Sequence, residues 1–179
     1  WKNPEDRNHI LGSAFFHRAY RYYRAVHQFG NVPFLDGELT EPKTDFYSSD
    51  RWSILERLYS DMEFAYKWVR ADAERGKVNK DACGVLLMKI CMSLGKFDRA
   101  IEIGNEIVAN HPLMTERFTS NKNKSRTNLM HDLHSVEAKL DMSNTEGIFY
   151  TSSYPDIVGS TRIYTMRCGV PSWNTGGQG

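Results

Sequence analysis

Apolar residues recur three and four positions apart in four stretches of the chain, which is the spacing of one face of an α-helix. These stretches cover residues 8–30, 50–71, 80–95 and 97–110. Residues that commonly end helices stand after or between them, namely Gly30, Gly76, Gly95 and Pro112. The pattern predicts a mainly α fold, with four helices packed as two antiparallel pairs.

The first and longest stretch carries a regular apolar stripe. The stripe consists of Leu11, Phe15, Ala19, Tyr22, Val26 and Phe29. Arg18 lies one position before Ala19, and a buried guanidinium needs a carboxylate or carbonyl partner. We therefore expect Arg18 to hold a loop or a neighbouring helix in place.

The chain changes character beyond the fourth stretch. Residues 129–140 have the pattern of a short amphipathic helix, and residues 148–151 (IFYT) that of a short strand. The last part of the sequence is rich in Ser, Gly and Pro and reads as loop. We predict a helical domain over residues 1–118 and the start of a loop-rich second subdomain, incomplete here, over residues 119–179.

Five residues around the last two apolar stretches stand at offsets that resemble the tetratricopeptide repeat. They are Leu87, Gly95, Phe97, Ala100 and Pro112. The glycine would make the tight turn, and the small side chain of Ala100 would lie where two helices touch. The aromatic residues usual in the first helix of that repeat are absent here. The first domain is therefore predicted to contain degenerate tetratricopeptide-like helical pairs.

Four phrases, in this order along the chain, resemble the SusD/RagB family of surface nutrient-binding lipoproteins of the bacterial outer membrane. The first is the helix with Ala14, Arg18, Ala19 and Tyr20 that closes in Gly30-Asn31-Val32-Pro33-Phe34. The second is the turn of residues 76–80, and the third is the repeat-like pair described above. The last consists of Asn144, Glu146 and Ile148. The resemblance covers residues 10 to about 150 and implies a SusD-like fold.

The resemblance also implies a function. Members bind an oligosaccharide, or in some cases a peptide, at the cell surface without making or breaking a bond. They deliver it to a TonB-dependent transporter barrel. The resemblance further implies a surface-exposed lipoprotein of the outer membrane, with a lipid anchor outside this chain as its only membrane attachment. We interpret the sequence as an internal piece of a longer protein.

Composition and charge argue against several other partners. The formal net charge is +1, from 23 basic and 22 acidic residues, so nothing favours nucleic acid or an anionic membrane. No apolar run approaches the roughly 20 residues that a membrane helix needs. The chain has three cysteines, Cys83, Cys91 and Cys168. An odd number gives no disulfide framework, so cysteine usage does not indicate the cellular compartment.

Candidate catalytic chemistry is sparse. His131 and His134 lie three positions apart on the predicted short helix and could reach one metal ion, but spacing supplies no third ligand. We interpret them as surface or packing histidines. The sequence contains no G-x-S-x-G nucleophile turn, no phosphate-binding glycine loop and no C-x-x-C pair. We predict a protein that is not an enzyme and uses neither cofactor nor metal.

Three residues near the end are the candidate ligand-binding residues. Trp173 follows Pro171 in a loop, where its ring could stack on the C–H face of a sugar, and Asn174 beside it could bond hydroxyl groups. Tyr154 is a second loop aromatic. A tryptophan packed back against the protein body remains the structural alternative. The alternative function is a generic helical-repeat scaffold that binds a protein or peptide segment.

Overall fold

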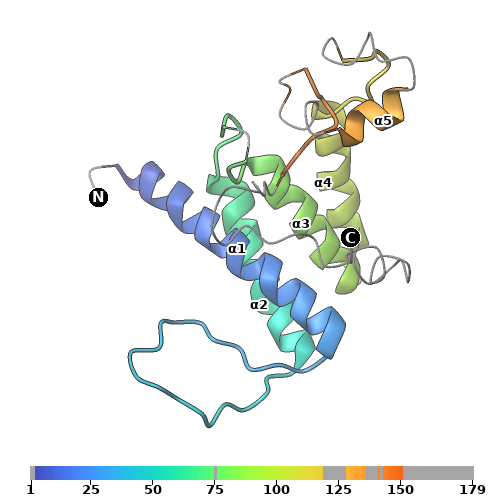
Figure 1. The fold of residues 1–179 in the computed structure, drawn as a ribbon. Coiled ribbons are helices and arrows are strands. Elements are labelled where there is room, and N and C mark those ends of the chain that lie inside the picture. Colours follow the sequence, from blue (N-terminus) through green and yellow to red (C-terminus); the bar gives the residue numbers. More distant parts are fainter. Residues whose placement is uncertain (1–2, 75, 119–127, 136–140, 142, 151–179) are drawn as a thin grey trace, which may run out of the picture.

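The structure is a computed structural model that describes residues 3–74, 76–118, 128–135, 141 and 143–150. Five α-helices lie in these residues (Figure 1). They are α1 (Pro4–Phe29), α2 (Arg51–Trp68), α3 (Lys80–Ser93), α4 (Phe97–Asn110) and α5 (Leu129–His134). The first four confirm the four helices predicted from the apolar stripes.

Capping side chains explain where the helices begin. The Asn3 side chain accepts a hydrogen bond from the Glu5 N–H, and Pro4 occupies the first turn, so α1 begins four residues before the predicted start. Asp50 caps α2 and Asn79 caps α3 in the same way. At the other ends, Gly30 closes α1 and Gly95 follows the C-cap of α3, both with positive φ, as expected of glycines that end helices. Helix α2 ends at Trp68, before the predicted residue 71, and Gly76 lies in the turn that follows.

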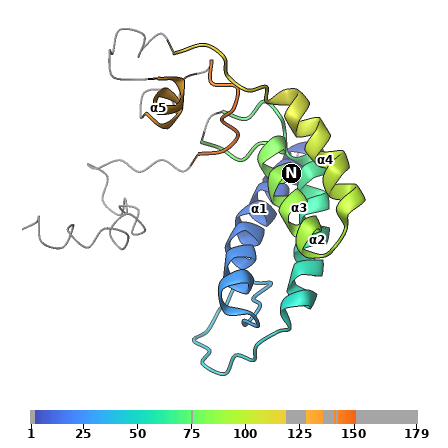
Figure 2. The same cartoon turned by 90° about the vertical axis from the view of Figure 1, so that its right-hand side faces the viewer.

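Helix α1 packs against α2, α2 against α3 and α3 against α4, and α1 also touches α3. Figure 2 shows consecutive helices running in opposite directions along a layered stack. Gly84 of α3 marks one close approach, because a Cβ added there would come within 2.8 Å of the Tyr66 ring of α2. Ala100 of α4 is 6% exposed, which fits its predicted place between two helices.

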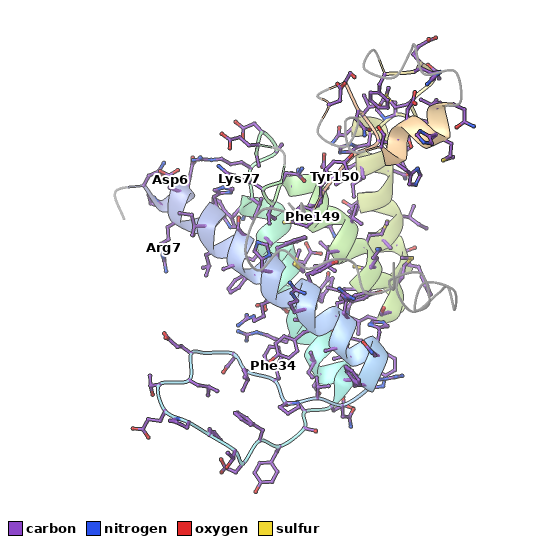
Figure 3. The ribbon with its side chains drawn as sticks, in the orientation of Figure 1. Asp6, Arg7, Phe34, Lys77, Phe149 and Tyr150 are labelled. Carbon is purple, nitrogen blue, oxygen red and sulfur yellow. The ribbon has the colours of Figure 1, made fainter. Side chains whose placement is uncertain are left out.

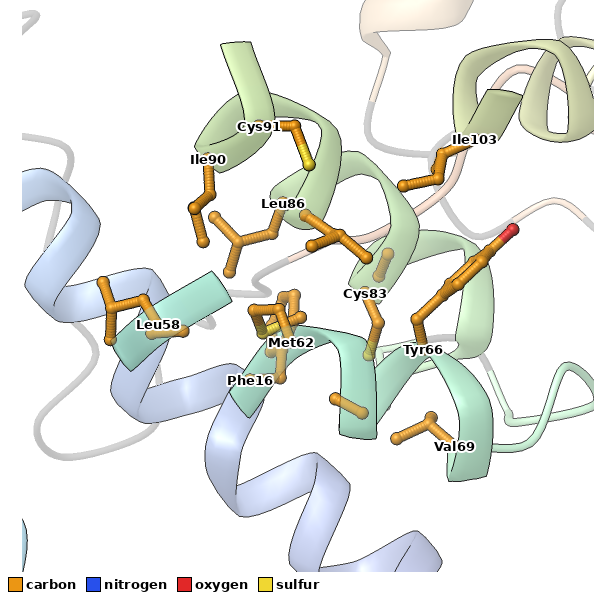
Figure 4. Close-up of a cluster of buried hydrophobic side chains, with 14 of the residues drawn as sticks. Phe16, Leu58, Met62, Tyr66, Val69, Cys83, Leu86, Ile90, Cys91 and Ile103 are labelled. Atoms are coloured by element: carbon orange, nitrogen blue, oxygen red, sulfur yellow. The ribbon is translucent and has the colours of Figure 1, made fainter. Parts of the chain in front are cut away.

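The core lies along the shared faces of α1 to α4 (Figure 4). Fully buried side chains come from each of these helices, including Ala19, Leu58, Met62, Leu87, Ile90 and Ile103. Burying such a side chain contributes roughly 1.5–3 kcal/mol, so the stack is held mainly by these apolar contacts. Cys83 and Cys91 are buried in the same core as free thiols. None of the described helices is long and apolar enough to span a membrane.

Arg18 has the role predicted for it. Its Nη2 lies 2.6 Å from Asp61 Oδ2 of α2, and its Nη1 donates to the Asp36 carbonyl at 3.2 Å. Asp61 is 4% exposed and also lies 3.4 Å from Arg57 Nε. The guanidinium therefore ties α1 to α2 and to the loop between them. Tyr22 supports the same loop, because its hydroxyl accepts from the backbone N–H of Leu35 at 2.7 Å.

Two expectations for the later part of the chain are not met. The helix predicted over residues 129–140 ends at His134, because Ser135 is extended, and residues 136–140 lie outside the described part. Residues 148–150 form no strand, so the short strand predicted there is wrong as far as the structure describes it. The Ile148 carbonyl accepts instead from the Asn79 side chain at 2.9 Å. The domain boundary at residue 118 remains a prediction.

Candidate functional site

A groove of about 520 Å³ lies where α1, α3 and α5 meet the segment of residues 144–150, which we call the 144–150 wall. Aromatic and aliphatic side chains contribute most of the lining, with several polar groups among them. The lining residues are Phe16, Tyr20, Ala82, Val85, Leu86, Lys89, Met130, Leu133, His134, Asn144, Glu146, Gly147, Ile148, Phe149 and Tyr150. Its size and mixed lining are those of a small-ligand site.

Aromatic rings connect the 144–150 wall to α1. The Phe149 ring meets the Phe16 ring edge-on, with centroids 5.2 Å apart and planes at 72°. Phe16 in turn stacks on Tyr20 at 6.1 Å. Figure 3 shows Phe149 and Tyr150 beside the upper part of α3. Because Phe16 is 3% exposed while Tyr20, Phe149 and Tyr150 are only partly buried, the last three rings can meet a ligand.

Polar contacts fix the 144–150 wall against the ends of α3 and α4. His111, the residue after α4, has Nδ1 2.7 Å from the Thr145 carbonyl and Nε2 3.0 Å from Asp81 Oδ2 of α3. Glu146 Oε1 accepts from the Met114 backbone N–H at 2.7 Å. These bonds join residues about 30 positions apart in sequence and give the groove one defined side.

Two further bonds complete this support. The Thr145 hydroxyl donates to the Pro112 carbonyl at 2.7 Å, and the Asn144 amide lies 3.0 Å from the Tyr150 hydroxyl. Asn144 is 2% exposed, so its amide is part of the packed wall. The ring of Tyr150 is thus held at its polar end, which orients it at the edge of the groove.

The described residues of the groove offer binding chemistry. Flat rings can stack on a ligand, while Lys89, His134 and Glu146 can bond its polar groups. Neither Cys83 nor Cys91 lines the groove, and burial raises the Cys83 pKa to about 12, so that thiol stays protonated. In the part of the chain that the structure describes, no three His, Cys, Asp or Glu side chains are grouped to hold a metal ion.

A second cavity, of about 460 Å³, lies between α1 and the turn that follows α2. Its charged lining residues are two cations, Arg70 and Lys77, and two carboxylates, Asp72 and Glu74. The two strongest charges are already paired, Arg70 with Asp6 and Lys77 with Glu74. Because these cations have partners in the protein, we favour the groove as the candidate site.

The structure does not test the residues predicted from the sequence to bind a ligand. Tyr154, Trp173 and Asn174 are outside the described residues, so their placement stays a prediction. His134 lines the groove, with its Nδ1 2.8 Å from the Met130 carbonyl of its own helix, and His131 is exposed.

Sequence reasoning did not select the groove aromatics. The sequence pattern places Tyr20 in a family phrase and predicts Phe149 and Tyr150 in a strand. The sequence does contain one signal for Phe149 and Tyr150, because they directly follow the family phrase of Asn144, Glu146 and Ile148.

The comparisons with known proteins agree with this architecture. A family model described as "Starch-binding associating with outer membrane" matches residues 1–91, which is half of the chain. The chain belongs to the SusD-like family. A curated relative, SusD-like protein P2 of Formosa agariphila, is 24% identical over 106 residues, which are 58% of this chain and 21% of that protein.

Solved structures of other SusD-like proteins show the same fold. A SusD-like protein of Bacteroides fragilis matches with a TM-score of 0.57 at 19% identity, over 68% of this chain and 26% of its own. A SusD superfamily protein of Bacteroides vulgatus matches with a TM-score of 0.55 at 18% identity, over 65% and 25%. A SusD-like carbohydrate binding protein of B. fragilis gives 0.51 at 21% identity, over 60% and 22%. This SusD-like chain thus spans about a fifth to a quarter of the length of these relatives.

Proposed function

We propose that this SusD-like chain is part of a non-catalytic surface protein that binds an oligosaccharide and delivers it to a TonB-dependent transporter of the outer membrane. The match of half the chain to a family described as starch-binding and associated with the outer membrane carries the proposal. Attachment to the membrane would come through a lipid anchor outside this chain. The transporter barrel would be the protein partner.

The groove supports binding rather than turnover. Tyr20, Phe149 and Tyr150 present partly exposed rings, and sugars are held by stacking on such rings combined with hydrogen bonds to their hydroxyl groups. The 144–150 wall is fixed by bonds to α3 and α4 before any ligand arrives, which lowers the ordering cost of binding. The loop residues Tyr154, Trp173 and Asn174 would add further stacking and hydroxyl contacts.

A peptide is the second candidate ligand, and the aliphatic part of the groove favours it. Val85, Leu86, Met130 and Leu133 offer a surface that suits an apolar side chain better than a sugar. In that case the protein would act as a helical-repeat scaffold that holds a peptide nutrient or a protein segment. The two ligand classes are distinguished by direct binding measurements with each.

The test is isothermal titration calorimetry of the purified protein with a panel of oligosaccharides and peptides. Trp173→Ala should weaken oligosaccharide binding about five- to thirtyfold, since roughly 1.4 kcal/mol corresponds to a factor of ten in affinity. Trp52→Ala is the matched control, because Trp52 is 48% exposed at the start of α2, far along the chain from the predicted site.

Tyr150→Ala tests the groove in the same way, with Tyr47→Ala as its control because Tyr47 is 87% exposed in the α1–α2 loop. We expect weaker oligosaccharide binding for Tyr150→Ala and wild-type affinity for Tyr47→Ala. Tight peptide binding without any oligosaccharide binding would replace the proposal with the scaffold alternative. Equal oligosaccharide affinity of wild type, Trp173→Ala and Tyr150→Ala would remove both rings from the site.

A further inference from the structure

The contact between His111 and the 144–150 wall depends on the protonation of the imidazole. Nδ1 faces the Thr145 carbonyl at 2.7 Å, and Nε2 faces the Asp81 carboxylate at 3.0 Å. A carbonyl and a carboxylate oxygen can only accept, so each ring nitrogen must donate for both bonds to form. A neutral imidazole carries one N–H and can satisfy only one of them. Both bonds therefore exist together only in the doubly protonated ring.

Asp81 and His111 lie at two helix ends whose dipoles favour opposite charges. Asp81 lies in the first turn of α3, and His111 caps the C-terminal end of α4. A carboxylate is stabilised near a helix N-terminus and a cation near a C-terminus, so both helices favour the charged pair. The two side chains are 17% and 18% exposed, which screens their attraction only partly.

The other bonds that hold the 144–150 wall do not respond in the neutral pH range. Asn79 donates to the Ile148 carbonyl through an amide, and the Thr145 hydroxyl donates to the Pro112 carbonyl. Glu146 accepts from the Met114 N–H through a carboxylate oxygen. Among these contacts of the described residues, only an imidazole changes its charge between about pH 5 and pH 8.

The surrounding elements contribute further charged and titratable groups. These are Tyr66 of α2, Lys80 and Asp81 of α3, Glu106 of α4 and Glu146 of the wall. Glu106 accepts from the Tyr66 hydroxyl at 2.5 Å, and Lys80 lies over the Tyr66 ring at 4.8 Å. Both charges are thus directed at Tyr66. Asp81 is the charged side chain in direct contact with His111.

We propose that His111 is a positioning residue that holds the 144–150 wall, and with it the ligand groove, in a pH-dependent manner. At low pH the imidazolium bridges Asp81 and Thr145 and fixes the wall against α3 and α4. When the ring has lost one N–H, a lone pair faces either the carboxylate or the carbonyl. The wall is released from one of its supports, and the groove becomes less ordered. The expected effect on ligand affinity rests on the proposed function.

The first test needs no ligand. The Met114 amide reports on the wall, because its N–H, in the segment that follows α4, donates to Glu146 Oε1 of the wall. We would measure its hydrogen-exchange protection factor, which corrects for the intrinsic pH dependence of exchange, by NMR at pH 5.5 and pH 8. In wild type the protection should fall about three- to tenfold as the pH rises, the effect of losing one partly exposed charged bond.

Two variants should remove the pH response. In His111→Gln the side-chain amide keeps its donor hydrogens at every pH. In Asp81→Asn the new amide can donate to the ring nitrogen, so a neutral imidazole keeps both bonds. His134→Gln is the matched control, because His134 lines the groove but bonds only to its own helix in the described contacts, and it should keep the wild-type response. A flat wild-type profile, or the same fall in wild type and His111→Gln, would overturn the proposal.

The second test links the wall to ligand binding. Oligosaccharide affinity measured by calorimetry should fall between pH 5.5 and pH 8 in wild type and stay constant in His111→Gln. Affinity that falls equally in both proteins would show that the wall does not position the site. Failure of every protein to bind any oligosaccharide at either pH would reject the proposed function, while the exchange measurement would still decide the role of His111.

Discussion

Replacing Arg18 by methionine should destabilise the fold strongly, because it leaves a buried carboxylate without its nearest cation. Arg18 Nη2 lies 2.6 Å from Asp61 Oδ2, and the Asp61 side chain is 5% exposed. Removing one partner of a buried ion pair costs about 3–5 kcal/mol. Arg57 remains 3.4 Å from the other carboxylate oxygen, and the Arg18 side chain is 19% exposed, so we expect roughly 2–3 kcal/mol.

Urea unfolding followed by circular dichroism measures this loss, with Arg7→Met as the control. Arg7 lies on the same helix, but it is exposed. The midpoint of thermal unfolding should fall by roughly 2–4 °C for each kcal/mol in a chain of this length. The double variant Arg18→Met with Asp61→Leu should recover part of the stability, because no unpaired charge remains. If Arg18→Met were as stable as Arg7→Met, the buried ion pair would not hold the α1–α2 interface.

Three further predictions concern the helix stack. Ala100→Trp should destabilise the fold by about 1–3 kcal/mol through overpacking, whereas Ile101→Trp, at a position 61% exposed, should melt like wild type. In a variant whose only cysteine is Cys83, a thiol reagent should react only on unfolding, because burial raises the Cys83 pKa to about 12; fast reaction in the native state would contradict this. Glu63→Gln should cost about 1 kcal/mol at pH 7, since Arg99 bonds both carboxylate oxygens at 2.9 Å and lowers the Glu63 pKa. That contribution is present above the unfolded pKa of about 4.3 and lost as the pH falls through the lower folded pKa, so the difference from wild type in urea titrations should shrink steadily as the pH falls below about 4.3.

The four long helices could be predicted because their information is local. Apolar residues at helical spacing, together with glycines and a proline at the ends, determine which segments are helical and which face is buried. The early start of α1 is also encoded locally, since Asn3, Pro4 and Glu5 form a cap and a first turn. The apolar stripe begins later, and it therefore predicts a later start of the helix.

The 144–150 wall could not be predicted, because its contacts are between residues distant in sequence. The pattern of residues 148–151 has strand propensity, but the structure gives no neighbouring strand to the described residues of this segment. Phe149 packs on Phe16 instead, and the Ile148 carbonyl bonds to Asn79. A run of apolar residues does not reveal whether its partner is a strand or a helix face.

The candidate site also combines residues predicted from local sequence with residues that only the fold brings together. The sequence led to Tyr154, Trp173 and Asn174 through the chemistry of loop aromatics, and these remain predictions. The sequence places Tyr20 in a family phrase and Phe149 in a predicted strand, and neither pattern shows which rings will meet across the fold. Only the assembled fold brings both rings into the lining of one groove.

We propose that this SusD-like chain contributes to binding an oligosaccharide without altering it. Ligand-observed NMR of oligosaccharides titrated with the purified protein measures binding and turnover in one sample. We predict saturable broadening of the sugar resonances of at least one oligosaccharide, and an unchanged sugar spectrum after prolonged incubation. Resonances of a cleaved or modified sugar, or no broadening for any oligosaccharide while a peptide binds, would overturn this proposal.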